Sequence, residues 1–168
     1  MRRLLAVTLA CTALGLAVRL VGLDRENLWI DEVNTVAVAR GSPLGVAGRM
    51  AAFGETHPPL YYALGALLVN LLPETVPIHV TLRLLSAGAW FATIGLVWRA
   101  LRRLASKNDA AVVAALLLGV PGMVIASCMM TNDPLCAFFV TATVVRLLHA
   151  PTGGPLPLRH VVVTAITA

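Results

Sequence analysis

The chain has 168 residues, of which 58% are hydrophobic and only 12% are charged, and its formal net charge is +5. Soluble domains carry about 25% charged residues, and the apolar residues here fall in long blocks, so the composition excludes an ordinary soluble domain. The basic residues lie in short groups at the ends of those blocks, with almost no aromatic residues between them. This arrangement is typical of an integral membrane protein that obeys the positive-inside rule, and it argues against nucleic-acid binding.

The three cysteines, Cys11, Cys128 and Cys136, all lie inside apolar blocks and lack the spacing of metal ligands. Thiols in such surroundings usually behave as small hydrophobic side chains. We therefore expect neither a disulfide nor a zinc site.

Residues 4–23 predict the first transmembrane helix, because twenty residues at about 1.5 Å each cross the roughly 30 Å hydrocarbon layer. The only charge in this segment is Arg19, near its far end. A signal peptide is the alternative, but no small-x-small cleavage site follows. Arg2 and Arg3 favour a cytoplasmic N-terminus, so residue 24 onward is expected at the outer face.

Residues 24–58 form the predicted outer loop. Short helices are expected over residues 32–40 and 45–53, and both are predicted to lie at the membrane surface. Five apolar side chains are expected to face inward and two arginines to face the head groups: Val33, Val36, Ala37, Met50 and Phe53, with Arg40 and Arg49.

Residues 60–72 form an apolar stretch that is too short to span a bilayer, so we expect a re-entrant or interfacial helix there. If this stretch did cross, every later segment would invert and the basic loop after residue 101 would face outward, against the positive-inside rule. The later spans are predicted over residues 81–101, 110–130 with a bend at Pro121, and 134–149. Residues 160–168 look like the first part of another span, so the sequence is expected to be truncated.

Asp31 is the candidate general base, since a carboxylate that hydrogen-bonds an acceptor hydroxyl can remove its proton. The alternative is an N-cap for the helix that follows. Its neighbour Glu32 could orient a substrate, bind a cation, or only favour the helix N-terminus through the dipole. His57 precedes two prolines that fix its direction, and Asp133 follows Asn132 in the second outer loop, where an N-cap is again the alternative.

Four segments carry a resemblance to a known family. They are Leu28-Trp29-Ile30-Asp31-Glu32, His57-Pro58-Pro59-Leu60-Tyr61-Tyr62, Leu82-Arg83-Leu84-Leu85-Ser86-Ala87 and Asn132-Asp133. In this order they resemble the N-terminal part of the GT-C membrane glycosyltransferases, in the branch of the protein O-mannosyltransferases, aminoarabinose transferases and RgtA-like enzymes. The resemblance covers roughly residues 1 to 150.

The resemblance implies an all-α, multi-pass transmembrane helical bundle with surface helices in its first outer loop. It also implies inverting transfer of a sugar from a polyprenyl-phosphate donor, in the cell envelope, at the outer face of the plasma (inner) membrane. Asp31 matches the catalytic base and Glu32 its acidic neighbour. Asp133 matches an acid that places substrate or, together with Asp31, a divalent cation such as Mg or Mn.

The same resemblance places His57 near the donor phosphate and Asn132 among the substrate-binding residues. Arg83 falls in the Leu-Arg-Leu element, where it could offset phosphate charge or anchor the helix by snorkelling.

The family's members are longer than this chain, so a second chain could supply the missing C-terminal part. Two interpretations from other classes remain. One is a non-catalytic membrane scaffold, and the other is a transporter subunit with acids at mid-membrane depth. The transferase interpretation requires Asp31, His57 and Asp133 around one cavity, whereas a scaffold does not.

Overall fold

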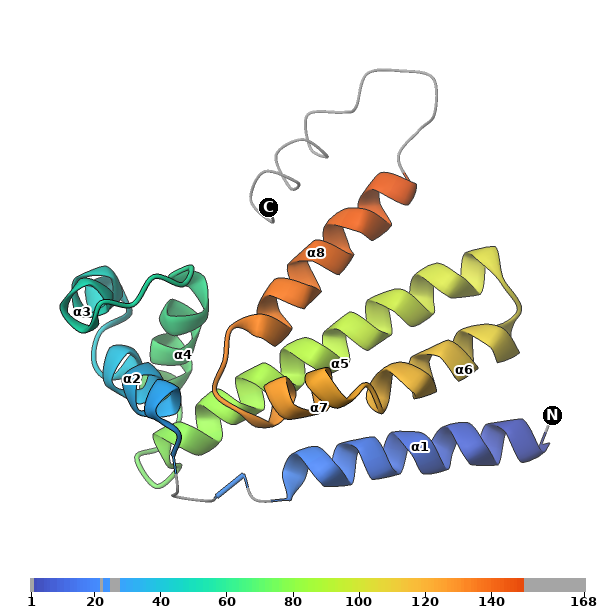
Figure 1. Cartoon of the computed structure of the whole chain (residues 1–168), viewed down its shortest axis with the longest axis horizontal. Coiled ribbons are helices and arrows are strands. Elements are labelled where there is room, and N and C mark those ends of the chain that lie inside the picture. Colours follow the sequence, from blue (N-terminus) through green and yellow to red (C-terminus); the bar gives the residue numbers. More distant parts are fainter. Residues whose placement is uncertain (1, 22, 25–27, 150–168) are drawn as a thin grey trace.

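The computed structural model describes residues 2–21, 23–24 and 28–149, and the regular structure in this part of the chain is entirely helical. The predicted all-α fold class is therefore confirmed, while the partial span predicted at residues 160–168 lies outside the described residues. The helices, shown in Figure 1, are α1 Arg2–Leu20, α2 Ile30–Ala39, the 3-10 helix η1 Pro43–Gly45, α3 Val46–Phe53, α4 Leu60–Leu71, α5 Ile78–Leu104, α6 Lys107–Leu118, α7 Pro121–Cys128 and α8 Asp133–Leu148.

The long helix α5 is the centre of the structure. It packs against α8, α6, α7, α4 and α2, whereas α1 packs along α6 and α7. Figure 1 shows the short helices α2, α3 and α4 gathered near the N-terminal end of α5. The segments predicted to form the outer loop and the short apolar helix therefore lie together at one end of the central helix.

Among the described residues, α5 is the one continuous helix that is long and apolar enough to cross a membrane. The pair α6 and α7 meets the same requirement when taken together, but the two helices are bent by 61°. Shorter apolar stretches lie at Leu9–Leu20 in α1 and Leu60–Leu71 in α4. Length and composition thus support one or two membrane crossings in this part of the chain.

The bend between α6 and α7 has a local cause and a tertiary support. Pro121 begins α7, as predicted, because proline lacks the N–H that would continue a helix. The carbonyl of Leu118, at the end of α6, instead accepts a hydrogen bond from the Arg19 guanidinium at 3.1 Å. Arg19 is 1% exposed and also donates to Ser127 Oγ at 2.7 Å. This buried side chain therefore holds α1 against both halves of the broken helix.

The two surface helices differ in part from the prediction. Val33 and Phe53 were expected to face inward, but they are 45% and 50% exposed. The reason for the difference at Val33 is that Glu32 and Thr35 turn toward the interior of the protein, where they bind Arg83 and the Met130 carbonyl, and Val33 lies off this buried face. Arg49 was expected to face the head groups, yet its Nε donates to the carbonyl of Val38 at 2.7 Å.

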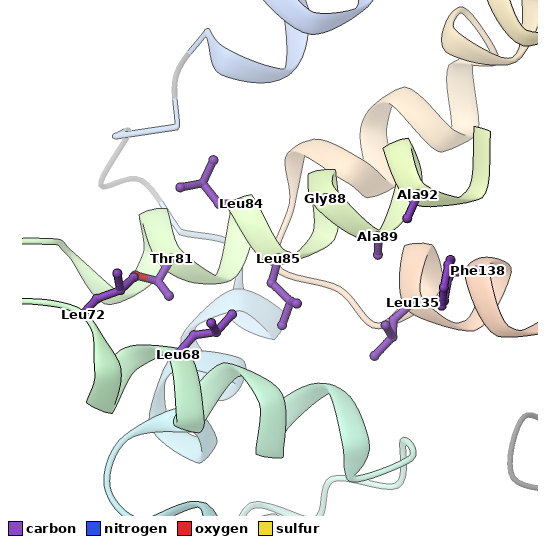
Figure 2. Close-up of a pocket in the computed structure, with 10 residues that line it drawn as sticks. All are labelled: Leu68, Leu72, Thr81, Leu84, Leu85, Gly88, Ala89, Ala92, Leu135 and Phe138. Carbon is purple, nitrogen blue, oxygen red and sulfur yellow. The ribbon is translucent and has the colours of Figure 1, made fainter. Parts of the chain in front are cut away.

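An apolar groove of about 450 Å³ lies between α4, α5 and α8, as Figure 2 shows. No described segment covers this groove, and an apolar surface of this kind suits contact with acyl chains. Ten residues line it: Leu68, Leu72, Thr81, Leu84, Leu85, Gly88, Ala89, Ala92, Leu135 and Phe138.

Candidate functional site

An acidic pocket of about 200 Å³ lies where α2, the loop before α4, and the loop before α8 meet. It contains four of the residues predicted from the sequence, and these come from three segments that are far apart in the chain. Nine residues line the acidic pocket: Asp31, Thr35, Glu55, His57, Tyr62, Met130, Thr131, Asn132 and Asp133.

Asp31 is the second residue of α2, and its side chain is exposed to the pocket. The N-cap of the helix is Trp29, so the alternative of Asp31 as an N-cap is wrong. No described residue donates a hydrogen bond to its carboxylate. Its carboxylate oxygens can therefore accept a hydrogen bond from a ligand hydroxyl in the pocket.

Asp133 has an equivalent position in α8. It is the first residue of that helix, and Asn132 is the N-cap, so the N-cap alternative for Asp133 is also wrong. The side chain of Asn132 makes no capping hydrogen bond; its Nδ2 lies 3.9 Å from Cys136 Sγ. Asn132 and Asp133 can therefore both turn their polar atoms toward a ligand in the acidic pocket.

His57 is paired with Glu55, a residue that the sequence analysis did not single out. The His57 Nδ1 atom and a Glu55 carboxylate oxygen form a hydrogen-bonded ion pair, and the same oxygen accepts the backbone N–H of His57 at 3.2 Å. Burial acts to raise the pKa of Glu55, but hydrogen bonds from His57 and its charge outweigh burial and lower that pKa. Since Nδ1 is engaged, Nε2 is the ring atom left for a ligand. The sequence did carry a signal for this pair, because Glu55 lies only two positions before His57.

Glu32 and Arg83 do not line the acidic pocket. They are 1% and 5% exposed and form a buried ion pair, in which Arg83 Nε and Nη2 donate to the two carboxylate oxygens at 3.2 and 3.1 Å. Arg83 also donates to the carbonyl of Leu23 at 3.0 Å. The structure therefore places these two residues beside the pocket, where each balances the other's charge, and brings neither one to the ligand space.

The Glu32 carboxylate also fixes the loop that carries Asn132 and Asp133. It accepts the backbone N–H of Met130 at 3.1 Å, while the carbonyl of Met130 accepts from Thr35 at 3.3 Å. The carbonyl of the next residue, Thr131, accepts from Ser86 in α5 at 3.0 Å. These bonds join α2, α5 and the loop, so they set the separation of Asp31 and Asp133. The roles of Thr35 and Ser86 depend on contacts distant in the chain, so no local sequence pattern indicated them.

Asp31 and Asp133 were also predicted as metal ligands. Carboxylate oxygens suit Mg or Mn by donor type, and both acids line the same pocket. In the described part of the chain, however, no three His, Cys, Asp or Glu side chains lie close enough together to hold a metal ion. A divalent cation at these two acids would take its other ligands from substrate and water, as Mg commonly does.

The acidic pocket combines groups for proton transfer with groups for binding. An exposed carboxylate can accept a proton from a hydroxyl, and imidazole and amide groups can donate hydrogen bonds to a sugar or a phosphate. With about 200 Å³ the pocket is smaller than a typical ligand site of about 300–1,000 Å³, so it accommodates part of a larger ligand. Comparisons with protein-family models, curated proteins and solved structures found no match to this chain.

Proposed function

We propose that this chain is the N-terminal part of an inverting GT-C-type membrane glycosyltransferase. It would move a sugar from a polyprenyl-phosphate donor to an acceptor at the outer face of the plasma membrane. The observation that carries the proposal is that Asp31, His57 and Asp133, which come from separate segments, line a single pocket. A non-catalytic scaffold, the alternative, has no need of this convergence.

In the proposed reaction, Asp31 removes the proton of the acceptor hydroxyl as that oxygen attacks the anomeric carbon of the sugar. The attack comes from the face of this carbon opposite the phosphate oxygen. The bond to that oxygen breaks as the new bond forms, so the configuration inverts and polyprenyl phosphate leaves. Asn132 and His57 bind the sugar and phosphate, and Asp133 places them. The ion pair of Glu32 with Arg83 has a positioning role: it does not contact the substrate, but it holds the loop that carries Asp133 against α2.

The adjacent apolar groove supports a lipid-linked donor. Three carboxylates line the acidic pocket, so the donor phosphate would need a divalent cation to balance their negative charge. The first turn of α8 joins the two sites, because Asp133 lines the acidic pocket and Leu135 lines the apolar groove. A donor could therefore place its phosphate in the pocket and its polyprenyl chain in the groove.

We also propose that the chain is a multi-pass protein of the plasma (inner) membrane with a cytoplasmic N-terminus. Single cysteines at Thr56, Ser106 and Thr131, in a background without the three native cysteines, test this topology. An impermeant thiol reagent on intact cells should label positions 56 and 131 but not 106. Labelling at 106 and not at 131 would contradict the proposed topology.

The activity is tested with the full chain in proteoliposomes and a panel of fluorescent polyprenyl-phosphate sugars. Asp31→Asn should reduce transfer by at least about 100-fold, the usual contribution of a general base. Glu74→Gln, on an exposed residue outside the pocket, is the matched control and should leave transfer unchanged. Transfer by Asp31→Asn at the normal rate would exclude Asp31 as the base.

A binding measurement separates the transferase from the scaffold even if a second chain is needed for turnover. Native mass spectrometry should detect the lipid-linked donor on the wild type and on Asp31→Asn, whereas His57→Ala and Asp133→Ala should weaken its binding. A scaffold would retain no such donor, and its lipid binding would not respond to these substitutions.

A further inference from the structure

A second groove, independent of the acidic pocket and of the proposed transferase activity, lies at the C-terminal end of α5. It has a volume of about 490 Å³ and is lined by Gly95, Trp98, Arg99, Arg102 and Arg103, which we name the arginine groove. The arginine groove is about 24 Å along the helix from Arg83, at 1.5 Å per residue, so it belongs to the opposite end of α5 from the acidic pocket.

The arginine groove has an unbalanced positive charge. Three exposed guanidinium groups line it and no carboxylate does. The ion pairs found in the described residues, Glu55 with His57 and Glu32 with Arg83, involve none of the three. The acid of the following turn, Asp109, accepts a hydrogen bond from Ser106 at 2.7 Å instead. Neighbouring like charges repel one another, so an anion in the groove would lower the electrostatic energy.

The position of the arginine groove along α5 indicates that the anion belongs to the head-group region of the bilayer. The helix has 27 residues and a length of about 40 Å, whereas about 20 residues cross the hydrocarbon layer. Counted from Ile78, the hydrocarbon layer ends near Val97. Trp98 then lies at the interface, where tryptophan is enriched, and the arginines reach the level of the head groups.

Two details show that the groove is already arranged for a ligand. The Arg102 guanidinium lies 4.9 Å from the ring centroid of Trp98, which is 41% exposed, so a cation–π contact orients this donor. At Gly95 an added Cβ would meet nothing within 4 Å, so the glycine leaves open space beside the arginines. The open space adjoins the apolar part of α5, which crosses the bilayer under the proposed topology, as a lipid with its acyl chains in the bilayer requires.

We propose that the arginine groove binds the head group of an anionic phospholipid, for which phosphatidylglycerol serves as the probe below. The phosphodiester oxygens accept hydrogen bonds from the guanidinium groups, which present paired donors suited to phosphate. The glycerol backbone occupies the space beside Gly95, next to the indole of Trp98. This assignment gives the cluster a specific ligand in addition to its contribution to membrane orientation.

The test uses the purified full chain in a neutral detergent and native mass spectrometry with phosphatidylglycerol or phosphatidylcholine as the added probe. Gly95→Leu fills the groove and keeps every charge, so membrane orientation is unaffected and helix propensity improves. Arg102→Gln removes one donor. Arg102→Gln should weaken phosphatidylglycerol binding about tenfold, since a charge-assisted hydrogen bond carries about that much affinity. Gly95→Leu should weaken it by a similar factor of about ten, because the leucine side chain occupies the space of the lipid. The control Arg146→Gln removes the same charge from an exposed residue outside the groove and should change binding less than about twofold.

Three results would overturn the proposal. Gly95→Leu and Arg102→Gln could bind phosphatidylglycerol as well as Arg146→Gln does. This would show that the lipid is attracted by the net positive charge of the protein and does not occupy the groove. Phosphatidylcholine could bind as tightly as phosphatidylglycerol. Inorganic phosphate could displace the lipid at equal concentration, which would identify a site for free phosphate. Selective retention of phosphatidylglycerol, lost in both groove variants, would support the proposal.

Discussion

Replacing Arg83 with Met leaves the buried carboxylate of Glu32 without its positive partner. Removing one member of a buried ion pair costs about 3–5 kcal/mol, because the remaining charge stays desolvated. Here the carboxylate loses two hydrogen bonds of 3.2 and 3.1 Å but keeps the backbone N–H groups of Met130, at 3.1 Å, and Trp29, at 3.3 Å. Because two donors remain, we expect Arg83→Met to reduce the free energy of unfolding by about 3 kcal/mol.

The measurement is reversible unfolding in mixed micelles titrated with dodecyl sulfate and followed by far-UV circular dichroism. The double variant Glu32→Met with Arg83→Met is the informative control, because replacing both members of a buried pair with apolar groups is often close to neutral. It should be more stable than Arg83→Met alone. A loss below about 0.5 kcal/mol for Arg83→Met would refute the argument that this pair is desolvated and coupled. The argument would also be refuted if the loss of unfolding free energy in the double variant equalled the sum of the losses in Glu32→Met and Arg83→Met alone.

Two further predictions concern packing and pH. Gly65→Ala should destabilise the protein by about 1–3 kcal/mol in the same unfolding assay, because an added Cβ would lie 2.4 Å from Cδ2 of the buried Leu82. Gly88→Ala, where nothing lies within 4 Å, should be neutral or stabilising by up to about 1 kcal/mol, and equal effects at both glycines would contradict the packing argument. Glu55 has a lowered pKa, so its ionised form contributes stability that is complete above about pH 4.5, its ordinary pKa, and is lost as the pH falls through the lowered value. Carbon-13 NMR of the glutamate carboxyl should show His57→Ala raising this pKa, and an unchanged titration would show that the His57 contact is not its cause.

The sequence predicted the helical architecture well, because the signals for it are local. Apolar blocks, the proline at 121 and the breakers around residue 73 determine where helices can start, bend and end. Helix starts in the outer loop were less accurate, since α2 begins at Ile30 and its buried face differs from the expected one. Asp31 therefore proved to be an exposed residue of the first turn, outside the N-cap position.

The candidate site was predicted in part. The expected grouping of Asp31, His57 and Asp133 around one pocket agrees with the structure, which adds Asn132 to the same lining. The chemical roles of these residues stay predictions. The third acid of the pocket, Glu55, was not predicted, although its spacing of two residues from His57 was a usable sequence signal.

Sequence alone determined the apolar character of the chain, the helices and the candidate polar residues, because hydrophobicity and backbone propensity act over a few neighbouring residues. Only the tertiary structure decided which charges face a ligand and which neutralise one another. Glu32 and Arg83 are 51 positions apart, and Met130 is 98 positions from Glu32, so no local pattern indicates their contact. A buried charge is stable only beside a suitable partner, and that partner is chosen by how α2, α5 and the loop before α8 pack together.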